Sequence, residues 1–333
     1  MLLTCQAGFE SLLVRELAAA GIMAQQHGPG WVVAERAPDE PAFAHLLLPD
    51  AVEVRGESVN ALAQRLADFF LTGIRGERIE TAWPCVLAGP AELVGLGRRI
   101  GAVEKAVLDL LRKKLSRVAK LAVPDLPRGV GEARGLFGWF TDFGVMQVAR
   151  TARSNGQRRM ADDDAAPSRS YLKVEEAYVV LGTEPQPGEL VVDLGAAPGG
   201  WSYSAAKRGA RVIAIDNGPL KGGALNHPQI EHRREDAFRY APPAGPVCDW
   251  LFCDMVEEPH HVLRHIVEPW LARGWCRNFV VNLKFGRVDP VALLSELRAP
   301  DSPLTRHAPG TRIRHLYHDR EEFTLTGRVQ PVE

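Results

Sequence analysis

The sequence predicts an α/β protein whose C-terminal half forms a doubly wound, mainly parallel sheet with a terminal antiparallel hairpin, preceded by a smaller α+β region. In that half the apolar runs ELVVD, RVIAID, DWLFCD and NFVVNLK alternate with helical stretches, which is the pattern of a buried parallel sheet. The first run leads directly into a glycine-rich loop, DLGAAPGGW. The chain has 333 residues, more than one ordinary core accommodates, so we expect at least two domains.

The first 150 residues predict short, mixed elements. A strand from Leu2 to Cys5 is followed, after a turn at Gly8, by an amphipathic helix from Glu10 to Ala20. We further expect a strand at 31–34, helices at 41–48 and 60–71, a long helix at 98–120, and β-like runs at 135–140 and 143–150. We find no catalytic motif in this region.

The segment Thr151 to Pro167, TARSNGQRRMADDDAAP, predicts a linker because it is polar and carries a basic run followed by three aspartates. We therefore divide the chain into 1–60, 61–150, a linker at 151–166, and 167–333. In the last part, the run into Arg234-Glu235-Asp236 predicts another strand. RIRHLYH and EFTLTGR predict the terminal hairpin around a short DRE turn.

Composition excludes several classes of protein. The formal net charge is −1, so a nucleic-acid partner must be sought in local patches. The five cysteines are scattered and never spaced C-x-x-C, which argues against a disulfide framework or a zinc site and suits a reducing cytosol. The chain has no apolar run of 18 residues, and its N-terminus lacks the basic segment of a signal peptide. We expect a cytoplasmic protein without a membrane span.

The glycine-rich loop and three aspartates predict a ligand crevice. Gly195, Gly199 and Gly200 allow close backbone approach, but the loop is neither G-x-G-x-x-G nor a P-loop. Asp193 ends the first strand, where it can meet the cationic end of an amino-acid-bearing ligand. Asp216 ends the next, where an acid accepts the ribose hydroxyls of an adenosine, and Asp236 ends the third, near an adenine amino group. One such acid alone is explained by capping; three favour the crevice.

Four further ionisable residues stand at suggestive points of the sequence. Lys173 lies just before the predicted sheet, Asp254 ends DWLFCD, Lys284 ends NFVVNLK and Glu321 lies in the DRE turn. A lysine that closes an apolar strand needs a partner, because burying an unpaired charge is costly. The four residues indicate either two structural ion pairs or a proton-transfer site.

These residues resemble the FtsJ-type ribose 2′-O-methyltransferase family. The family's glycine signature appears as DLGAAPGGW, and its Lys–Asp–Lys–Glu tetrad matches Lys173, Asp254, Lys284 and Glu321, with Glu322 the adjoining alternative. The resemblance covers about residues 165 to 330. APSRSYLKVEEA, IDNGP, REDAF, CDMVE, GWCRN and LYHDREE are most similar to the members that methylate a cytidine of bacterial 23S ribosomal RNA. Those members carry an RNA-binding THUMP domain behind a ferredoxin-like piece, and CQAGFESLLVRELAAAG resembles their opening.

The resemblance implies a Rossmann-fold methyltransferase domain at 167–333, behind a ferredoxin-like piece at 1–60 and a THUMP-like RNA-binding domain at 61–150. It also implies S-adenosylmethionine as cofactor and 23S ribosomal RNA as partner. We expect no metal and a monomer. The residues it assigns to the methyl donor are Ser170, Asp193, Gly195, Ala197, Pro198, Gly199, Gly200, Trp201, Asp216, Asp236 and Asp254.

The implied reaction is an in-line transfer of the sulfonium methyl group to a 2′-oxygen. Lys284 would be the base, with Asp254, Lys173 and Glu321 orienting it and the hydroxyl. A lysine pKa of about 10.4 would have to fall to about 7.5, which costs roughly 4 kcal/mol. Burial and Lys173 lower that pKa, and the two acids raise it, so the sequence does not decide which effect wins. Much of the rate can instead come from holding oxygen and methyl in line.

The predicted helix 98–120 carries eight basic residues against Glu104 and Asp109. The set we assign to RNA binding is Arg98, Arg99, Arg112, Lys113, Lys114, Arg117, Arg158 and Arg159. A solvated helix face is the alternative. His260, His261 and His265 indicate a solvated helix rather than a metal site, because no cysteine or carboxylate set completes the ligands.

Two other functions stay open. An RNA base methyltransferase would carry an N/D-P-P-Y-type sequence at the fourth strand end, where this chain has CDMVEE; for C5 methylation, Cys253 would be the nucleophile. A catalytically inactive RNA-binding module is the second alternative, and the intact tetrad argues against it. A small-molecule methyltransferase explains neither the basic helix nor the tetrad.

Overall fold

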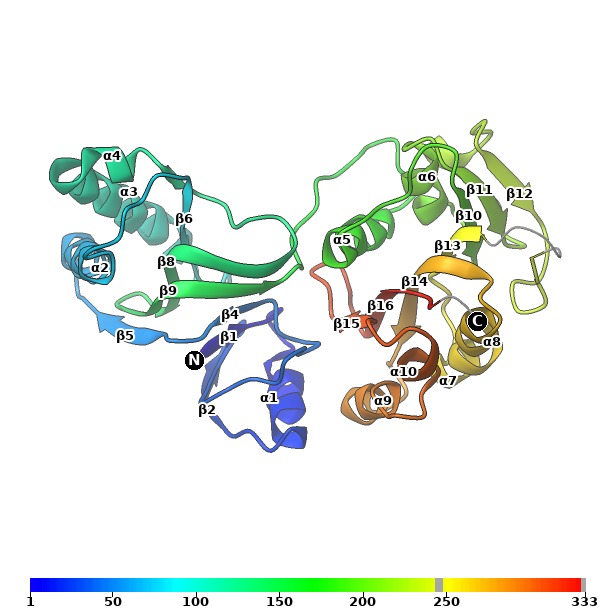
Figure 1. The fold of residues 1–333 in the computed structure, drawn as a ribbon, viewed down its shortest axis with the longest axis horizontal. Helices are drawn as coiled ribbons and strands as arrows, with labels where there is room; N and C mark the ends of the chain where they lie inside the picture. The colour runs from blue at the N-terminus through cyan, green and yellow to red at the C-terminus, as the bar shows by residue number, and fades with distance from the viewer. Residues whose placement is uncertain (243–247, 331–333) are drawn as a thin grey trace. The chain divides into compact units, whose positions relative to one another are not determined.

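The computed structural model describes residues 1–242 and 248–330, which form two compact units, Met1–Asn155 and Gly156–Glu333. Figure 1 shows the first unit in blue to green and the second in green to red. The predicted α/β class is confirmed. The division of the first unit near residue 60 stays a prediction, since one sheet includes strands from both sides of that position.

The first unit, every residue of which the structure describes, has a nine-stranded sheet with the order β2-β3-β1-β4-β9-β8-β6-β7 and β5 on β9. Its elements are β1 (Leu2–Thr4), α1 (Glu10–Ala19), β2 (Ala24–Gly28), β3 (Trp31–Ala34), β4 (Leu46–Leu48), β5 (Val52–Arg55), α2 (Val59–Gly73), β6 (Trp83–Ala88), α3 (Leu96–Lys114), α4 (Ser116–Ala119), β7 (Ala122–Val123), β8 (Val130–Asp142) and β9 (Val145–Asn155). Helices α2 and α3 share a hydrophobic core with β6 and β8.

Two predictions in this unit are wrong. The segment 41–48 is no helix: its end is β4, which pairs with β1 and β9. The amides of Ala42 and Phe43 donate instead to the buried carboxylate of Glu16, at 2.7 and 3.1 Å. The long helix 98–120 breaks at Leu115, whose backbone angles (φ −142°, ψ 67°) lie outside the helical region.

The second unit has a seven-stranded sheet over its described residues, in the order β12-β11-β10-β13-β14-β16-β15. Its elements are α5 (Tyr171–Leu181), β10 (Leu190–Leu194), α6 (Gly200–Ala206), β11 (Arg211–Ile215), η1 (Gly222–Ala224), β12 (Ile230–Arg233), β13 (Cys248–Cys253), α7 (Pro259–Val262), η2 (Leu263–Val267), α8 (Glu268–Ala272), β14 (Cys276–Lys284), α9 (Pro290–Leu297), α10 (Pro303–His307), β15 (Arg312–Arg314) and β16 (Glu322–Arg328).

The direction of the strands locates the crevice. Strands β10 to β14 pair in parallel, and β16 is antiparallel to β14 and β15, as the terminal hairpin predicted. The chain proceeds from β10 outward to β12 and then returns to place β13 on the other side of β10. Ligands bind open sheets of this kind outside the carboxyl ends of the strands at such a reversal, here between β10 and β13.

The residues predicted as a linker, 151–166, are divided between the units. Thr151–Asn155 continue β9 and pair with β8. Beyond them, the amide of Arg158 donates to Glu176 on α5 at 3.0 Å, and the amide of Met160 to His318 Nε2 at 3.0 Å. Asp163 accepts from the Tyr203 hydroxyl on α6 at 3.2 Å. The segment after Asn155 is therefore attached to the surface of the second unit.

In the described ranges 1–242 and 248–330, no helix combines the length and the hydropathy needed to cross a bilayer. All five cysteines are free and buried.

Candidate active site

A cavity of about 390 Å³ opens at the carboxyl ends of β10, β11 and β13, within the size range of small-molecule sites. Its wall comes from the loops that follow these strands and β12. The lining residues are Gly195, Ala197, Asp216, Asn217, Glu235, Asp236, Ala237, Phe238, Asp254, Met255, Val256 and Glu257. Of the residues predicted to bind the methyl donor, five lie here: Gly195, Ala197, Asp216, Asp236 and Asp254.

The glycines of the loop after β10 serve two purposes. Gly195 lines the cavity at φ +75°, and a Cβ there would lie 2.2 Å from Met255 Cγ. Gly199 and Gly200 let α6 begin against its neighbours, because Cβ atoms there would lie 2.5 Å from Ala224 Cβ and 2.9 Å from Ser170 Oγ. Gly199, Gly200 and Pro198 do not line the cavity. The two glycines are therefore explained by the close packing of α6 against its neighbours.

Asp216 follows β11 and joins two loops of the cavity wall. Its Oδ2 accepts from the Ala197 amide at 2.9 Å and its Oδ1 from the Gly218 amide at 2.7 Å. Both oxygens keep lone pairs free for a diol. Asp236 lies three residues beyond the end of β12, not within that strand, and accepts from the Phe238 amide at 2.9 Å. The ring of Phe238 lines the same cavity.

Three residues predicted for the methyl donor lie behind the cavity wall. Asp193 is buried, accepts from Ser202 Oγ at 2.6 Å, and has its pKa raised to about 7, mainly by burial. Trp201 packs edge-on against Phe252 in the core, and its Nε1 donates to the Ser170 carbonyl at 2.9 Å. In this structure these residues support the loop rather than line the cavity.

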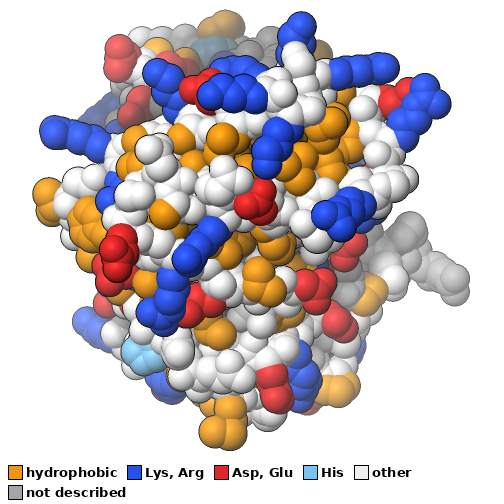
Figure 2. All heavy atoms as spheres, turned by 90° about the vertical axis from the view of Figure 1, so that its left-hand side faces the viewer, with side chains coloured by type: hydrophobic (Ala, Val, Ile, Leu, Met, Phe, Trp, Pro, Cys, Tyr) orange, Lys and Arg blue, Asp and Glu red, His pale blue; other side chains and the backbone are white. Residues whose placement is uncertain are grey.

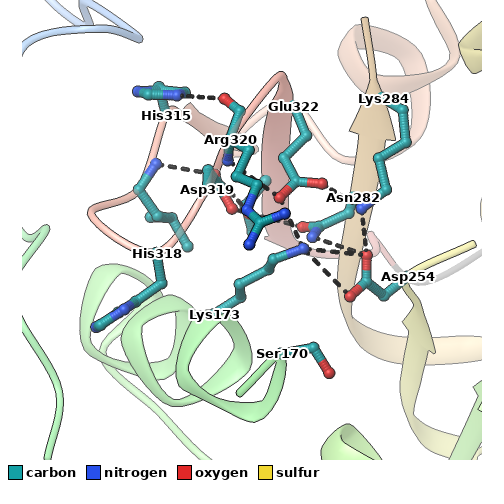
Figure 3. A network of polar contacts seen from close by, with 12 residues as sticks. Ser170, Lys173, Asp254, Asn282, Lys284, His315, His318, Asp319, Arg320 and Glu322 are labelled. Atoms are coloured by element: carbon teal, nitrogen blue, oxygen red, sulfur yellow. Dashed lines mark hydrogen bonds and ion pairs between the residues drawn. The ribbon is translucent and has the colours of Figure 1, made fainter. Parts of the chain in front are cut away.

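The Lys–Asp–Lys–Glu set does come together, with one change (Figure 3). Lys173 projects from α5, Asp254 follows β13, and Lys284 ends β14. Lys284 Nζ lies 2.7 Å from Asp254 Oδ1, and Lys173 Nζ lies 3.4 Å from Asp254 Oδ2. Asp254 lines the cavity, so the set adjoins it.

The acid of the set is Glu322, and the prediction of Glu321 is wrong. Glu322 is buried and Glu321 exposed. Glu322 Oε1 lies 2.7 Å from Lys173 Nζ, and Oε2 pairs with Lys284 Nζ. Lys284 and Glu322 are cross-strand partners in β14 and β16, which places their side chains on one face. Because successive side chains along a strand point to opposite faces, the position of Glu321 corresponds to the face opposite Lys284.

Each ammonium of the set contacts both carboxylates, so the four residues form one network rather than two separate ion pairs. Burial opposes the charged form of Lys284, but Asp254 and Glu322 outweigh it and raise its pKa above the ordinary value. Burial likewise opposes the ionised form of Glu322, but Lys173 and Lys284 outweigh it and lower its pKa. The structure thus holds Lys284 as an ammonium at neutral pH.

Sequence reasoning missed residues whose role depends on tertiary structure. Phe238 and Met255 line the cavity, and Asn282 donates to Asp254 Oδ1 at 3.1 Å. Phe238 follows Asp236 by two positions and Met255 follows Asp254 directly, so nearness to the predicted acids was the available signal. Asn282 precedes Lys284 by two positions and therefore shares its face of β14.

Most of the predicted RNA-binding residues lie on α3 and α4; the buried stripe of α3 includes Val103, Val107 and Leu111. Figure 2 shows Lys and Arg spread over this side of the molecule among hydrophobic and acidic side chains. Of the predicted residues, Arg98, Arg112, Lys113, Lys114, Arg117 and Arg159 are exposed. Arg99 is half-buried and donates to the Glu57 carbonyl at 2.8 Å. Arg158 and Arg159 belong to the second unit, where Arg159 lies over the Tyr317 ring at 5.9 Å.

Comparison with known proteins bears directly on the second unit: residues 166–284 match the FtsJ-like methyltransferase family. The second unit contains an FtsJ-like methyltransferase domain. This match includes the glycine loop, Lys173, Asp254 and Lys284, and ends before Glu322. A domain of this family takes its methyl group from S-adenosylmethionine. The cavity fits S-adenosylmethionine, because it offers carboxylates at two strand ends, the Phe238 ring and the Met255 side chain.

Several curated relatives carry the name ribosomal RNA large subunit methyltransferase M. The protein of Laribacter hongkongensis is 46% identical over 176 residues, which cover 50% of this chain and 48% of the relative. That of Marinomonas sp. is 42% identical over 181 residues, with 51% and 50% covered. That of Alkalilimnicola ehrlichii is 38% identical over 234 residues, with 64% of each covered. The chain thus spans about half to two thirds of the length of these relatives.

Proposed function

We propose that this protein transfers the methyl group of S-adenosylmethionine to a ribose 2′-hydroxyl of a cytidine in 23S ribosomal RNA. The observation that carries the proposal is the network of Lys173, Asp254, Lys284 and Glu322 beside the cavity. The relatives' name supports a large-subunit ribosomal RNA as substrate. The resemblance described above supports a cytidine of 23S RNA as the target.

The cavity residues hold the methyl donor. Asp216, fixed by the amides of Ala197 and Gly218, would accept hydrogen bonds from ribose hydroxyls, and Asp236 from an adenine amino group. Phe238 would pack against the adenine ring. When bound, S-adenosylmethionine supplies a methyl group on a positively charged sulfur. Asp254 borders both this cavity and the two lysines, so the acceptor hydroxyl would lie between the cavity and the lysines.

Lys284 is the residue that takes the hydroxyl proton at Nζ. Because its pKa is raised, only the small neutral fraction of the amine accepts a proton, and that fraction grows about tenfold per pH unit below the pKa. Asp254 and Glu322 hold Nζ in place, and Lys173 balances their charge. Positioning of the hydroxyl by this network supplies a further part of the rate.

The basic residues of α3 and α4 bind RNA phosphates in this proposal, and the region 61–150 acts as the THUMP-like RNA-binding domain. Arg98, Lys113 and Arg117 are exposed and have the density of charge that phosphate contacts need. Arg158 and Arg159 contribute from the second unit. We further propose that the protein acts in the cytoplasm as a monomer and uses no metal.

Two observations weaken base methylation as an alternative. Cys253, the nucleophile it would need at C5, is fully buried in β13, and burial raises its thiol pKa to about 12. A thiolate nucleophile needs access and a lowered pKa. The residues after β13 are Asp254-Met255-Val256-Glu257, which do not supply the N/D-P-P-Y pattern.

The test uses the full chain with tritiated S-adenosylmethionine and separate 23S and 16S RNAs from cells that lack the corresponding methylation. Label should enter 23S RNA and stay absent from 16S RNA. Calorimetry measures binding of the methyl donor in parallel. Binding of the donor without label in either RNA would contradict the proposed activity and favour an inactive RNA-binding module.

A further inference from the structure

A series of hydrogen-bonded side chains runs from Asp254 into the interior of the second unit. Asn282 Nδ2 lies 3.1 Å from Asp254 Oδ1, and Asn282 Oδ1 lies 2.7 Å from Thr324 Oγ1. Thr324 Oγ1 in turn lies 3.0 and 3.2 Å from the two carboxyl oxygens of Asp319. The side chains of Asn282, Thr324 and Asp319 are all buried, at most 1% exposed, so water does not compete for these contacts. Figure 3 shows Asn282 beside Asp254 and Asp319 beside Glu322.

The register of β14 and β16 brings these hydrogen-bonded side chains together. Asn282 and Thr324 face each other across β14 and β16, two positions from the pair Lys284 and Glu322 and therefore on the same face. Asp319 lies in the turn before β16, where its Oδ2 also accepts from the Leu316 amide at 2.8 Å.

The direction of each hydrogen bond follows from the number of protons available. Asp254 contacts two ammonium groups and is an ionised acceptor, so Asn282 must present its NH₂ group to it. The carbonyl of Asn282 then faces Thr324, whose hydroxyl has a single proton and must donate it there. Toward Asp319, Thr324 has only lone pairs left.

We infer that Asp319 is a protonated carboxylic acid that acts as a positioning residue, donating to Thr324 and through Asn282 fixing Asp254 against Lys284. The proton belongs on Oδ1, since Oδ2 accepts from the Leu316 amide. The inference rests on the proposed function for its effect on methyl transfer. It adds no proton-transfer step, because the proton of Asp319 stays in place throughout the reaction.

The surroundings of Asp319 favour this neutral form. Burial, followed by the charge of Glu322, raises the pKa of Asp319 to about 8, although Lys173 opposes the shift. Glu176 on α5 interacts unfavourably with an ionised Asp319. Asp254, which contacts Lys284, is connected to Asp319 through the hydrogen bonds of Asn282 and Thr324. With Asp319 neutral, the two ammonium groups of Lys173 and Lys284 are balanced by Asp254 and Glu322 alone.

A pH dependence follows. Above about pH 8, Asp319 ionises and becomes an acceptor, and the Thr324 hydroxyl turns toward it. Asn282 then loses its donor and its hold on Asp254. The activity of the native chain should therefore rise less steeply with pH above about 8 than below it, whereas Asp319→Asn, whose amide donates at every pH, should keep the steeper rise.

Four variants of the full chain test the inference. Thr324→Val removes the hydroxyl and should lower kcat about tenfold, with the KM for the methyl donor changed by less than about twofold. Thr324→Ser keeps the hydroxyl and should retain kcat within about threefold. Asp319→Asn should also retain kcat within about threefold at pH 7. The matched control is Thr326→Val on the same face of β16. Its hydroxyl is equally buried but has no hydrogen-bond partner among the described residues.

Infrared spectra give a readout that does not depend on turnover. The native chain at pH 7 should show the carbonyl band of a protonated carboxyl that is missing in Asp319→Asn and disappears above pH 8. Absence of this band would overturn the inference, as would equal losses in Thr324→Val and Thr326→Val, or a loss in Asp319→Asn as large as in Thr324→Val. A native chain that shows the band but methylates no RNA would contradict the proposed function and leave Asp319 protonated as inferred.

Discussion

Replacing Glu322 by Gln is the sharpest probe of the charge network. Its side chain is 4% exposed and pairs with the ammonium groups of Lys173 and Lys284. Removing one partner of a buried ion pair costs about 3–5 kcal/mol. We expect the lower end, about 3 kcal/mol, because Gln keeps the shape and an acceptor oxygen and because Asp254 still pairs both lysines.

Urea unfolding followed by tryptophan fluorescence measures this loss. A loss of about 3 kcal/mol lowers the midpoint by about 1 M or more, since the slope for ordinary domains is about 1–3 kcal/mol per M. The folded-state pKa of Glu322 lies below its ordinary value, so its stabilisation is complete at neutral pH. That stabilisation disappears as the pH falls through the folded-state pKa, and native and variant midpoints should converge in acid.

The matched control is Glu321→Gln, one residue away. The Glu321 side chain is exposed, and its backbone carbonyl, which accepts from the Phe285 amide at 2.9 Å, is unchanged by the substitution. We expect neither the unfolding midpoint nor methyl transfer to change. The reasoning is refuted if the two variants behave alike, or if Glu322→Gln unfolds within about 0.3 M urea of the native chain.

Three further predictions concern the other parts of the site. Lys284→Ala should abolish methyl transfer and leave the calorimetric affinity for S-adenosylmethionine unchanged. The rate of the native chain should rise with pH between 6 and 8. Activity of the variant within about tenfold of the native chain, or a flat pH profile, would remove Lys284 from the base role. Asp216→Ala should raise the KM for the methyl donor more than it lowers kcat, by an amount worth about 1.5–3 kcal/mol. Steady-state kinetics at varied donor concentration measure this, and an unchanged KM would contradict the prediction. Reversing Arg112, Lys113 and Arg117 to Glu should raise the KM for RNA and flatten its log–log salt dependence by about 0.7–0.9 per lost phosphate contact, and unchanged RNA affinity at low salt would exclude the helix as a binding surface.

The sequence predicted the parts of the site that lie at strand ends. Asp216, Asp254 and Lys284 each follow or close an apolar run, and parallel strands bring such positions to one edge of the sheet. The acid of the network was missed by one residue, because two consecutive glutamates fit the motif and only the register with β14 selects Glu322. That register depends on contacts far apart in the sequence.

The orientation of a side chain was likewise beyond a sequence pattern. Asp193 lies at the predicted strand end, but its carboxylate turns to Ser202 and away from the cavity. The strand β4 was predicted as part of a helix, because a short apolar run such as LLL has no periodicity that separates the two structures. Its pairing with β1 and β9 decides the outcome.

The central claim is that the methyl group goes to a ribose oxygen, and alkaline hydrolysis of labelled product tests it most directly. Alkali cleaves RNA through the free 2′-hydroxyl, so a 2′-O-methylated nucleotide survives within a dinucleotide. After reaction of the native chain with 23S RNA and tritiated S-adenosylmethionine, the label should remain in an alkali-resistant dinucleotide that yields 2′-O-methylcytidine on digestion to nucleosides. Label released as a mononucleotide with a methylated base would contradict the account.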